Sequence, residues 1–131
     1  MRVYLDTAPV IYLVEGIEPY FALIAQRLSD QDITQVCGEL TRLEARVKPI
    51  RLGQTALLSA FDAYFADIIS EIIPLTRAVV DEATDLRARY NFRTPDALQL
   101  ASAIAGGCEL FLTNDVALRK CTKIEVEVIP L

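Results

Sequence analysis

Short apolar runs alternate along this chain with longer stretches of helical periodicity, and this alternation limits the folds that the chain can adopt. The short runs are rich in β-branched and other apolar residues and cover residues 3–5, 33–36, 72–75, 110–112 and 126–129. Between them, apolar residues recur at the three- and four-residue spacing that is typical of a helix. Repeated strand–helix order favours an α/β fold with a parallel sheet. We therefore expect a three-layer α/β fold, in which a central, mainly parallel sheet of about five short strands is flanked by helices.

The composition predicts one domain that covers residues 1–131. The chain has 131 residues, 53% of them hydrophobic, which is enough to bury a substantial core. No apolar segment approaches the roughly 18 residues of a membrane span. The first apolar run is followed at once by Asp6, unlike the apolar stretch of a signal peptide. We expect a cytoplasmic protein that does not enter a membrane.

The residue types that are missing exclude several kinds of chemistry. Histidine is absent, which removes the usual general acid and base at neutral pH. The three cysteines lack CxxC spacing and have no histidine with which to form a zinc site. No glycine-rich phosphate-binding motif occurs. The net charge of -5 argues against non-specific binding to duplex nucleic acid. Carboxylate oxygens are the ligands that remain.

Four acidic residues stand beside predicted strands or within predicted helices. Asp6 follows the first apolar run and Asp115 follows the fourth, while Glu44 and Asp96 fall in helical segments. The carboxyl ends of parallel strands form one edge of a sheet, where α/β proteins place their ligands. Clustered carboxylates suit Mg²⁺ or Mn²⁺, which can activate water and neutralise a phosphodiester. This arrangement points to a metal-dependent nuclease.

Each acid also has a structural alternative. Thr94 as N-cap and Pro95 at the first helical position would put Asp96 in a first turn, where the helix dipole favours a carboxylate. Asp115 would cap the helix that follows it, and Glu44 would pair with the lysine four residues later. The order of all four acids together favours the shared site.

Four segments resemble a known family. They are "VYLDTAPVIYLVE", "ELTRLEAR", "RTPDALQLASAI" and "LFLTNDVALRK", and in this order and spacing they look like the motifs of PIN-domain proteins of the VapC toxin type. The resemblance runs from Val3 to the final strand. It implies Asp6, Glu44, Asp96 and Asp115 as the catalytic quartet, Asp6, Asp96 and Asp115 as metal ligands, and Thr7, Thr113 and Asn114 as supporting polar residues.

The same resemblance implies a function. Similar proteins are endoribonucleases that depend on Mg²⁺ or Mn²⁺, in which a metal-bound water cuts RNA to leave a 5′-phosphate and a 3′-hydroxyl. They act as toxins, are restrained by a cognate antitoxin protein, and commonly form homodimers. From its position three residues before Asp96, we further expect Arg93 to contact the substrate phosphate.

Two alternatives to the toxin ribonuclease stay open. Many relatives carry Asn or Ser two residues after the first aspartate, where this chain has Ala8. A catalytically weak or inactive interaction module with the same fold is therefore the first alternative. A Mg²⁺-dependent phosphatase of the DxDx[TV] kind is the second, although Ala8 stands where its second aspartate is required.

Two further points concern the choice of the second catalytic acid and the binding of the antitoxin. Glu39 lies close enough to Glu44 to be mistaken for it, and the "LTRLE" context favours Glu44. Surplus apolar residues in the helices around residues 10–30 and 45–68, which include Tyr12, Leu13, Tyr20 and Phe21, predict a groove for an amphipathic antitoxin helix.

Overall fold

The computed structural model describes residues 1–129 of the chain. Residues 130 and 131, the last two of the predicted domain, lie outside this range. The elements in chain order are β1 (Arg2–Leu5), α1 (Thr7–Glu15), α2 (Tyr20–Arg27), β2 (Thr34–Gly38), α3 (Glu39–Arg51), α4 (Thr55–Asp67), β3 (Glu71–Ile73), α5 (Arg77–Tyr90), α6 (Thr94–Ala105), β4 (Leu110–Thr113), the short 3₁₀-helix η1 (Val116–Lys120) and β5 (Glu125–Val128).

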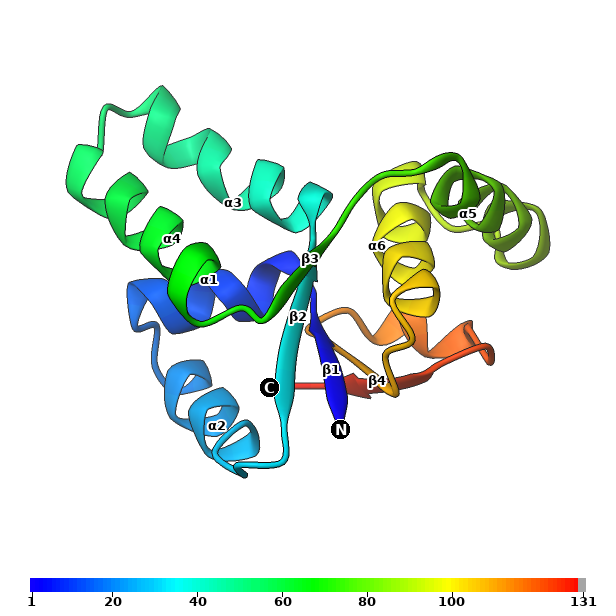
Figure 1. The fold of residues 1–131 in the computed structure, drawn as a ribbon, viewed down its shortest axis with the longest axis horizontal. Helices are drawn as coiled ribbons and strands as arrows, with labels where there is room; N and C mark the ends of the chain where they lie inside the picture. The colour runs from blue at the N-terminus through cyan, green and yellow to red at the C-terminus, as the bar shows by residue number, and fades with distance from the viewer. Residues whose placement is uncertain (130–131) are drawn as a thin grey trace.

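The strands form one parallel sheet in the order β3-β2-β1-β4-β5. Helices α1 to α4 lie on one side of the sheet, and α5 and α6 lie on the other (Figure 1). The prediction of a three-layer α/β fold with a parallel five-stranded sheet is confirmed. The chain adds β2 and β3 on one side of β1, and β4 and β5 on the other. The strand order therefore switches direction between β1 and β4, which is where such sheets open a crevice for ligands.

Both faces of the sheet are buried, as the continuous apolar strands predict. Side chains along β1 alternate between the two faces. Val3 and Leu5 belong to a core cluster with Phe61 of α4, whereas Tyr4 belongs to a second cluster with Leu100 of α6. Because each helical layer has its own core, β1 is fixed from both sides, and so is the residue that follows it.

The starts of α5 and α6 are fixed by different side-chain contacts. Thr76 is the N-cap of α5, and its hydroxyl accepts a hydrogen bond from the Val79 amide. Helix α6 begins at Thr94, one residue earlier than predicted, so Arg93 occupies the N-cap position. The Thr94 hydroxyl accepts a hydrogen bond from Arg87 Nη1 (3.2 Å) instead of capping the helix. Asp96 still lies in the first turn.

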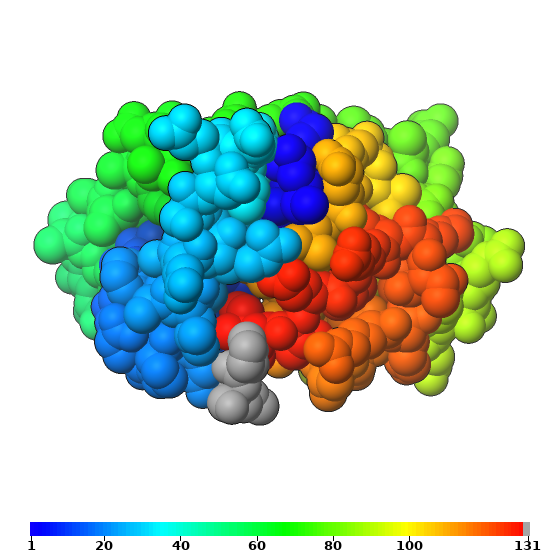
Figure 2. All heavy atoms as spheres, turned by 90° about the horizontal axis from the view of Figure 1, so that it is seen from below, coloured from blue at the N-terminus to red at the C-terminus, as the bar shows by residue number. Residues whose placement is uncertain are grey.

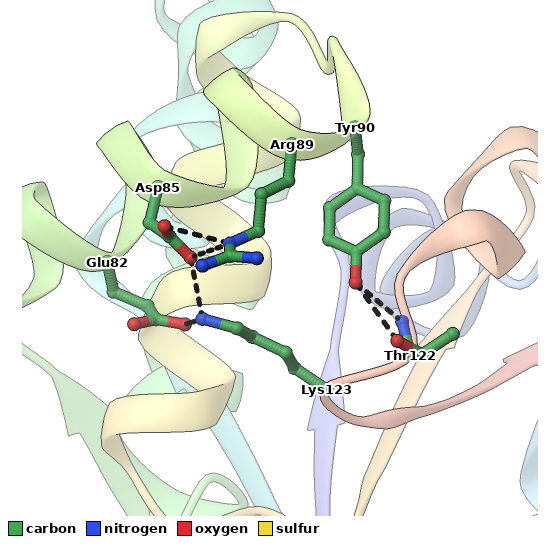
Figure 3. Close-up of polar contacts among 6 residues, drawn as sticks. All are labelled: Glu82, Asp85, Arg89, Tyr90, Thr122 and Lys123. Atoms are coloured by element: carbon green, nitrogen blue, oxygen red, sulfur yellow. Dashed lines mark hydrogen bonds and ion pairs between the residues drawn. The ribbon is translucent and has the colours of Figure 1, made fainter.

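A polar network holds the segment after η1 against α5 (Figure 3). Lys123 Nζ lies 2.9 Å from Glu82 Oε1 and 2.7 Å from Asp85 Oδ2, and the Tyr90 and Thr122 hydroxyls are 3.0 Å apart. Single exposed ion pairs contribute little to stability, but several charges in one network contribute more. The network anchors the end of the segment that starts with Asp115.

The amino ends of β1 and β2 lie at the end of the molecule seen in Figure 2. There the first residues of the chain lie between the start of β2 and the residues that follow α6 (Figure 2). Arg2 contributes to this end by donating from Nη2 to the Gly106 carbonyl (2.8 Å). The carboxyl ends of β1 and β2 lie at the opposite end (Figure 1).

Within residues 1–129, no single helix is both long and apolar enough to cross a membrane. Helices α1 and α2 reach that length and composition only together, across a bend of 108°.

Candidate active site

Asp6 lies directly after β1, beside the end of β4. Its Oδ1 accepts a hydrogen bond from the Thr7 amide (2.8 Å), so that Asp6 caps α1, and its Oδ2 accepts one from Thr113 Oγ1 (2.7 Å). The Asp6 amide donates to the Leu112 carbonyl of β4 (3.0 Å). Two donors and one backbone bond therefore fix this carboxylate at the switch point between the two strands.

Glu44 reaches the same place from α3. Its Oε1 accepts hydrogen bonds from Thr7 Oγ1 (2.7 Å) and from Gln99 Nε2 (2.8 Å). The competing acid, Glu39, instead lies 4.0 Å from Arg42 at the exposed start of α3. The geometry thus joins Glu44, and not Glu39, to the residues after β1.

Asp96 and Asp115 complete the set, but each already has a partner. Asp96 Oδ2 lies 3.4 Å from Arg93 Nε, and the Arg93 side chain is 82% exposed. Asp115 Oδ1 accepts a hydrogen bond from the Ala117 amide (2.9 Å), so Asp115 caps η1 as its structural alternative proposes. A cap of this kind still leaves the second carboxylate oxygen available.

The neighbouring acids influence the ionisation of Asp6 and Asp96. The pKa of Asp6 is raised to about 6, chiefly by burial; the hydrogen bonds from Thr113 and Thr7 oppose this rise, and the charges of Glu44 and Asp96 add to it. Burial also raises the pKa of Asp96, which Arg93 opposes and the charges of Asp115 and Glu44 reinforce. All four carboxylates are therefore close enough to interact, and a bound cation would relieve their mutual repulsion.

The oxygen ligands of the site suit a hard cation, although the acidic side chains do not converge on a single ion position. Carboxylate and hydroxyl oxygens are the ligands that Mg²⁺ and Mn²⁺ accept, and the site offers no sulfur or imidazole. Over the described residues, no three acidic or cysteine side chains are close enough to hold one metal ion as they stand. Mg²⁺ often binds through only one or two carboxylates and keeps several waters, so the residues fit a hydrated ion.

A family model for the PIN domain matches residues 3–124. The chain belongs to the PIN domain family. No curated protein sequence matches the chain significantly.

Solved structures resemble this PIN domain over nearly its whole length. A chain of the VapBC2 complex of Rickettsia felis, bound to a DNA fragment from the promoter, is 17% identical, with a TM-score of 0.80 and 98% of each chain covered. VapC20 of Mycobacterium tuberculosis, a toxin that cleaves the sarcin-ricin loop, is 14% identical, with a TM-score of 0.78 and coverage of 98% of this chain and 99% of that one. A chain of a toxin–antitoxin complex from Klebsiella pneumoniae is 21% identical, with a TM-score of 0.67 and coverage of 94% and 98%. At these identities the likeness concerns the fold.

The three polar residues predicted to support the site, Thr7, Thr113 and Asn114, do not all contact Asp6. Thr113 contacts Asp6, as a supporting residue would, but the Thr7 hydroxyl serves Glu44 and only its amide serves Asp6. The Asn114 side chain donates to the Tyr12 hydroxyl (3.2 Å) and not to an acid.

The sequence analysis missed Gln99, which contacts Glu44 directly. Its signal was available, because it is a polar residue in a helix that is apolar almost all round, three positions after Asp96.

Proposed function

We propose that this PIN domain is a metal-dependent endoribonuclease and the toxin of a toxin–antitoxin pair. The main support is the electrostatic coupling of Asp6 with Glu44 and Asp96 at the switch point of the sheet. Buried, mutually repelling carboxylates lower stability, and groups perturbed in this way cluster at functional sites. VapC20, which shares the fold, cleaves the sarcin-ricin loop.

Each acid has a role in this proposal. Asp6, Asp96 and Asp115 would hold the cation, and Glu44 would complete the set through Oε2, since its described donors both bind Oε1. Mg²⁺ or Mn²⁺ would supply an activated water and neutralise charge on the phosphodiester. Arg93, highly exposed and beside Asp96, would bind a substrate phosphate.

The inactive interaction module is the second candidate, and two observations favour it. The acids of the described chain do not converge on a single ion position, and Ala8 provides no polar group in the first turn of α1. Metal binding would then have to draw Asp96 away from Arg93.

Cleavage of labelled RNA separates the two candidates. Purified protein is incubated with single-stranded and structured RNAs in Mg²⁺, Mn²⁺ or EDTA, beside Asp96→Asn of equal thermal stability. Cutting that requires metal and is lost in Asp96→Asn supports the nuclease. Absence of both cutting and Mn²⁺ binding in the wild-type protein would favour the interaction module.

The toxin proposal has its own test in cells. Toxin–antitoxin complexes occur among the structures that share the fold. We expect expression of the wild-type chain to stop bacterial growth, Asp96→Asn to permit it, and co-expression of a cognate antitoxin to restore it. A wild-type chain that leaves growth unchanged at high expression would contradict the toxin role.

We assign the predicted homodimer interface to the exposed face of α3. Leu43, Val47 and Ile50 lie on one stripe of this helix and are 56%, 40% and 57% exposed. Together with Leu75 they line a shallow groove of about 440 Å³. Its rim carries both signs of charge, with Glu39 beside Arg42 and Arg46. In a dimer with a two-fold axis through this face, Glu39 of one copy would lie near Arg42 or Arg46 of the other.

Light scattering in solution tests the dimer. We expect a mass of two chains for the wild-type protein and of one chain for Val47→Glu. Val80→Glu, at another exposed apolar position on α5, serves as the control. A monomeric wild-type protein, or a dimer that Val47→Glu leaves intact, would contradict this assignment.

A further inference from the structure

Gln99 is a buried polar residue in the middle of α6, only 2% exposed. Its amide Nε2 donates to Glu44 Oε1 (2.8 Å) and to Thr7 Oγ1 (3.1 Å). Its Oε1 accepts hydrogen bonds from the Tyr4 hydroxyl and from Thr41 Oγ1 (3.0 Å). Both donors and both lone pairs of the amide are therefore used.

The network allows only one orientation of this amide. If the amide were rotated by half a turn, Gln99 Oε1 would face the Glu44 carboxylate, and two acceptors would lie against each other. The Tyr4 and Thr41 hydroxyls prevent that rotation by donating to Oε1. Thr41 is itself held, because its hydroxyl accepts a hydrogen bond from the Gly38 amide (3.3 Å).

The backbone makes room for the network at Gly38. A Cβ at this position would overlap the Tyr4 hydroxyl and lie 3.3 Å from Ser102 Oγ. The φ angle of Gly38 is -107°, which any residue can adopt, so space and not backbone conformation requires glycine here. The end of β2 is therefore shaped to admit a tyrosine hydroxyl from β1.

We propose that Tyr4, Thr41 and Gln99 form a buried relay that positions the Glu44 carboxylate, with Gln99 as a positioning residue for the active site. The proposal rests on the nuclease function and deepens it. A glutamate side chain has several rotatable bonds, and an unheld carboxylate would sample many positions. The relay fixes Oε1 through Gln99 and Thr7, which leaves Oε2 available to a cation.

The network joins five polar side chains, of which Tyr4, Thr41 and Gln99 are buried and Thr7 and Glu44 are half-buried. Its three buried members all have hydrogen-bond partners, so the network adds rigidity without leaving an unpaired buried group. Groups that orient ligands in this way typically change metal affinity or activity by tenfold to a hundredfold when they are removed.

Mn²⁺ titration calorimetry and single-turnover RNA cleavage test the relay. Gln99→Met keeps the volume of the side chain but removes its hydrogen bonds, and Tyr4→Phe removes only the outer hydroxyl. We expect roughly tenfold to a hundredfold weaker Mn²⁺ binding for Gln99→Met, a severalfold effect for Tyr4→Phe, and an RNA KM that changes less than the rate constant.

Gln35 and Tyr64 provide a matched control. The Tyr64 hydroxyl donates to Gln35 Oε1 (2.7 Å), a similar pair that contacts none of the four acids. Gln35→Met and Tyr64→Phe should leave Mn²⁺ affinity unchanged while changing thermal stability to a similar extent. Equal effects of both pairs on Mn²⁺ binding would reduce the relay to a stability element and overturn the proposal.

A double-mutant cycle with Glu44→Gln asks whether Gln99 acts through Glu44. We expect Gln99→Met to cause less than a twofold further loss in the Glu44→Gln background, because the residue it positions is already changed. Additive losses would overturn the proposal, as would a folded Gln99→Met that binds Mn²⁺ like the wild-type protein. A wild-type protein that neither binds Mn²⁺ nor cuts RNA would instead overturn the proposed function, and the relay's role with it. If Gln99→Met fails to fold, Tyr4→Phe decides by the same criteria.

Discussion

Thr113 Oγ1 donates a hydrogen bond to Asp6 Oδ2 over 2.7 Å, which joins the end of β4 to the residue after β1. The same hydroxyl accepts a hydrogen bond from the Asp115 amide (3.1 Å). One threonine therefore contacts two of the proposed acidic residues. Its removal should disturb both.

We expect Thr113→Val to weaken Mn²⁺ binding by about tenfold, because Asp6 loses the hydrogen bond that favours its ionised form. The free energy of unfolding of the metal-free protein should fall by about 1–2 kcal/mol near pH 8. Titration calorimetry and urea unfolding measure the two effects. Thr84→Val, which removes a hydroxyl bonded to the Val80 carbonyl on α5, is the control and should leave Mn²⁺ affinity unchanged.

Asp6 gives the metal-free protein a defined pH dependence. Its pKa is about 6 in the folded protein against 3.8 ordinarily, chiefly because of burial. Below about pH 4 Asp6 is protonated in both the folded and the unfolded chain, so the stability contributed by its raised pKa is fully present. As the pH rises from about 4 to about 6, the unfolded chain releases its proton first, and up to about 3 kcal/mol of stability is lost.

Urea unfolding of the metal-free protein between pH 4 and pH 8 measures this loss. Asp6→Asn lacks the titrating group, so the wild-type protein should lose stability relative to the variant across that window. Addition of Mg²⁺ should stabilise the wild-type protein at pH 7.5, where Asp6 is ionised, and much less at pH 4.5. Parallel curves for the two proteins would show that Asp6 has an ordinary pKa.

The sequence predicts the sheet and the edge where the acids lie, and the physical reason is local. Strands buried on both faces must be apolar throughout, so β1 and β4 stand out, and Asp6 and Asp115 follow them directly. The relay could not be predicted in the same way. Tyr4 and Gln99 are 95 residues apart in the chain, and only the packing of α6 on β1 brings them together.

The start of α6 shows a similar limit on a smaller scale. A threonine before a proline predicts an N-cap, but the Thr94 hydroxyl bonds to Arg87 of the preceding helix. The Arg87 side chain of α5 binds the Thr94 hydroxyl, so this hydroxyl does not cap α6. Local propensity could place Asp96 in the first turn but could not identify the cap.

Arg93 should affect substrate binding more than metal binding. Its side chain is 82% exposed and its contact with Asp96 is long, at 3.4 Å, so it can turn to an RNA phosphate at little cost. We expect Arg93→Gln to raise the KM for RNA by about threefold to tenfold and to reduce the slope of log affinity against log salt by about 0.7. Fluorescence anisotropy with labelled RNA at several salt concentrations measures both.

Arg89→Gln is the control for Arg93→Gln, because Arg89 is paired with Asp85 on α5 (2.9 Å) and contacts none of the four acids. It removes the same charge from the protein. If both variants weaken RNA binding equally, the effect belongs to net charge and Arg93 has no specific phosphate contact.

Gly38 should be required because of Tyr4, and a second substitution should remove that requirement. An alanine Cβ at position 38 would overlap the Tyr4 hydroxyl, so we expect Gly38→Ala to lower the free energy of unfolding by about 1–3 kcal/mol. In a Tyr4→Phe background the overlapping oxygen is absent, and the same substitution should cost much less. Urea unfolding of the four proteins in this cycle measures the coupling. If Gly38→Ala lowers the free energy of unfolding equally in both backgrounds, the Tyr4 hydroxyl is not the atom that excludes a Cβ at position 38. Another neighbour, such as Ser102, would then exclude it.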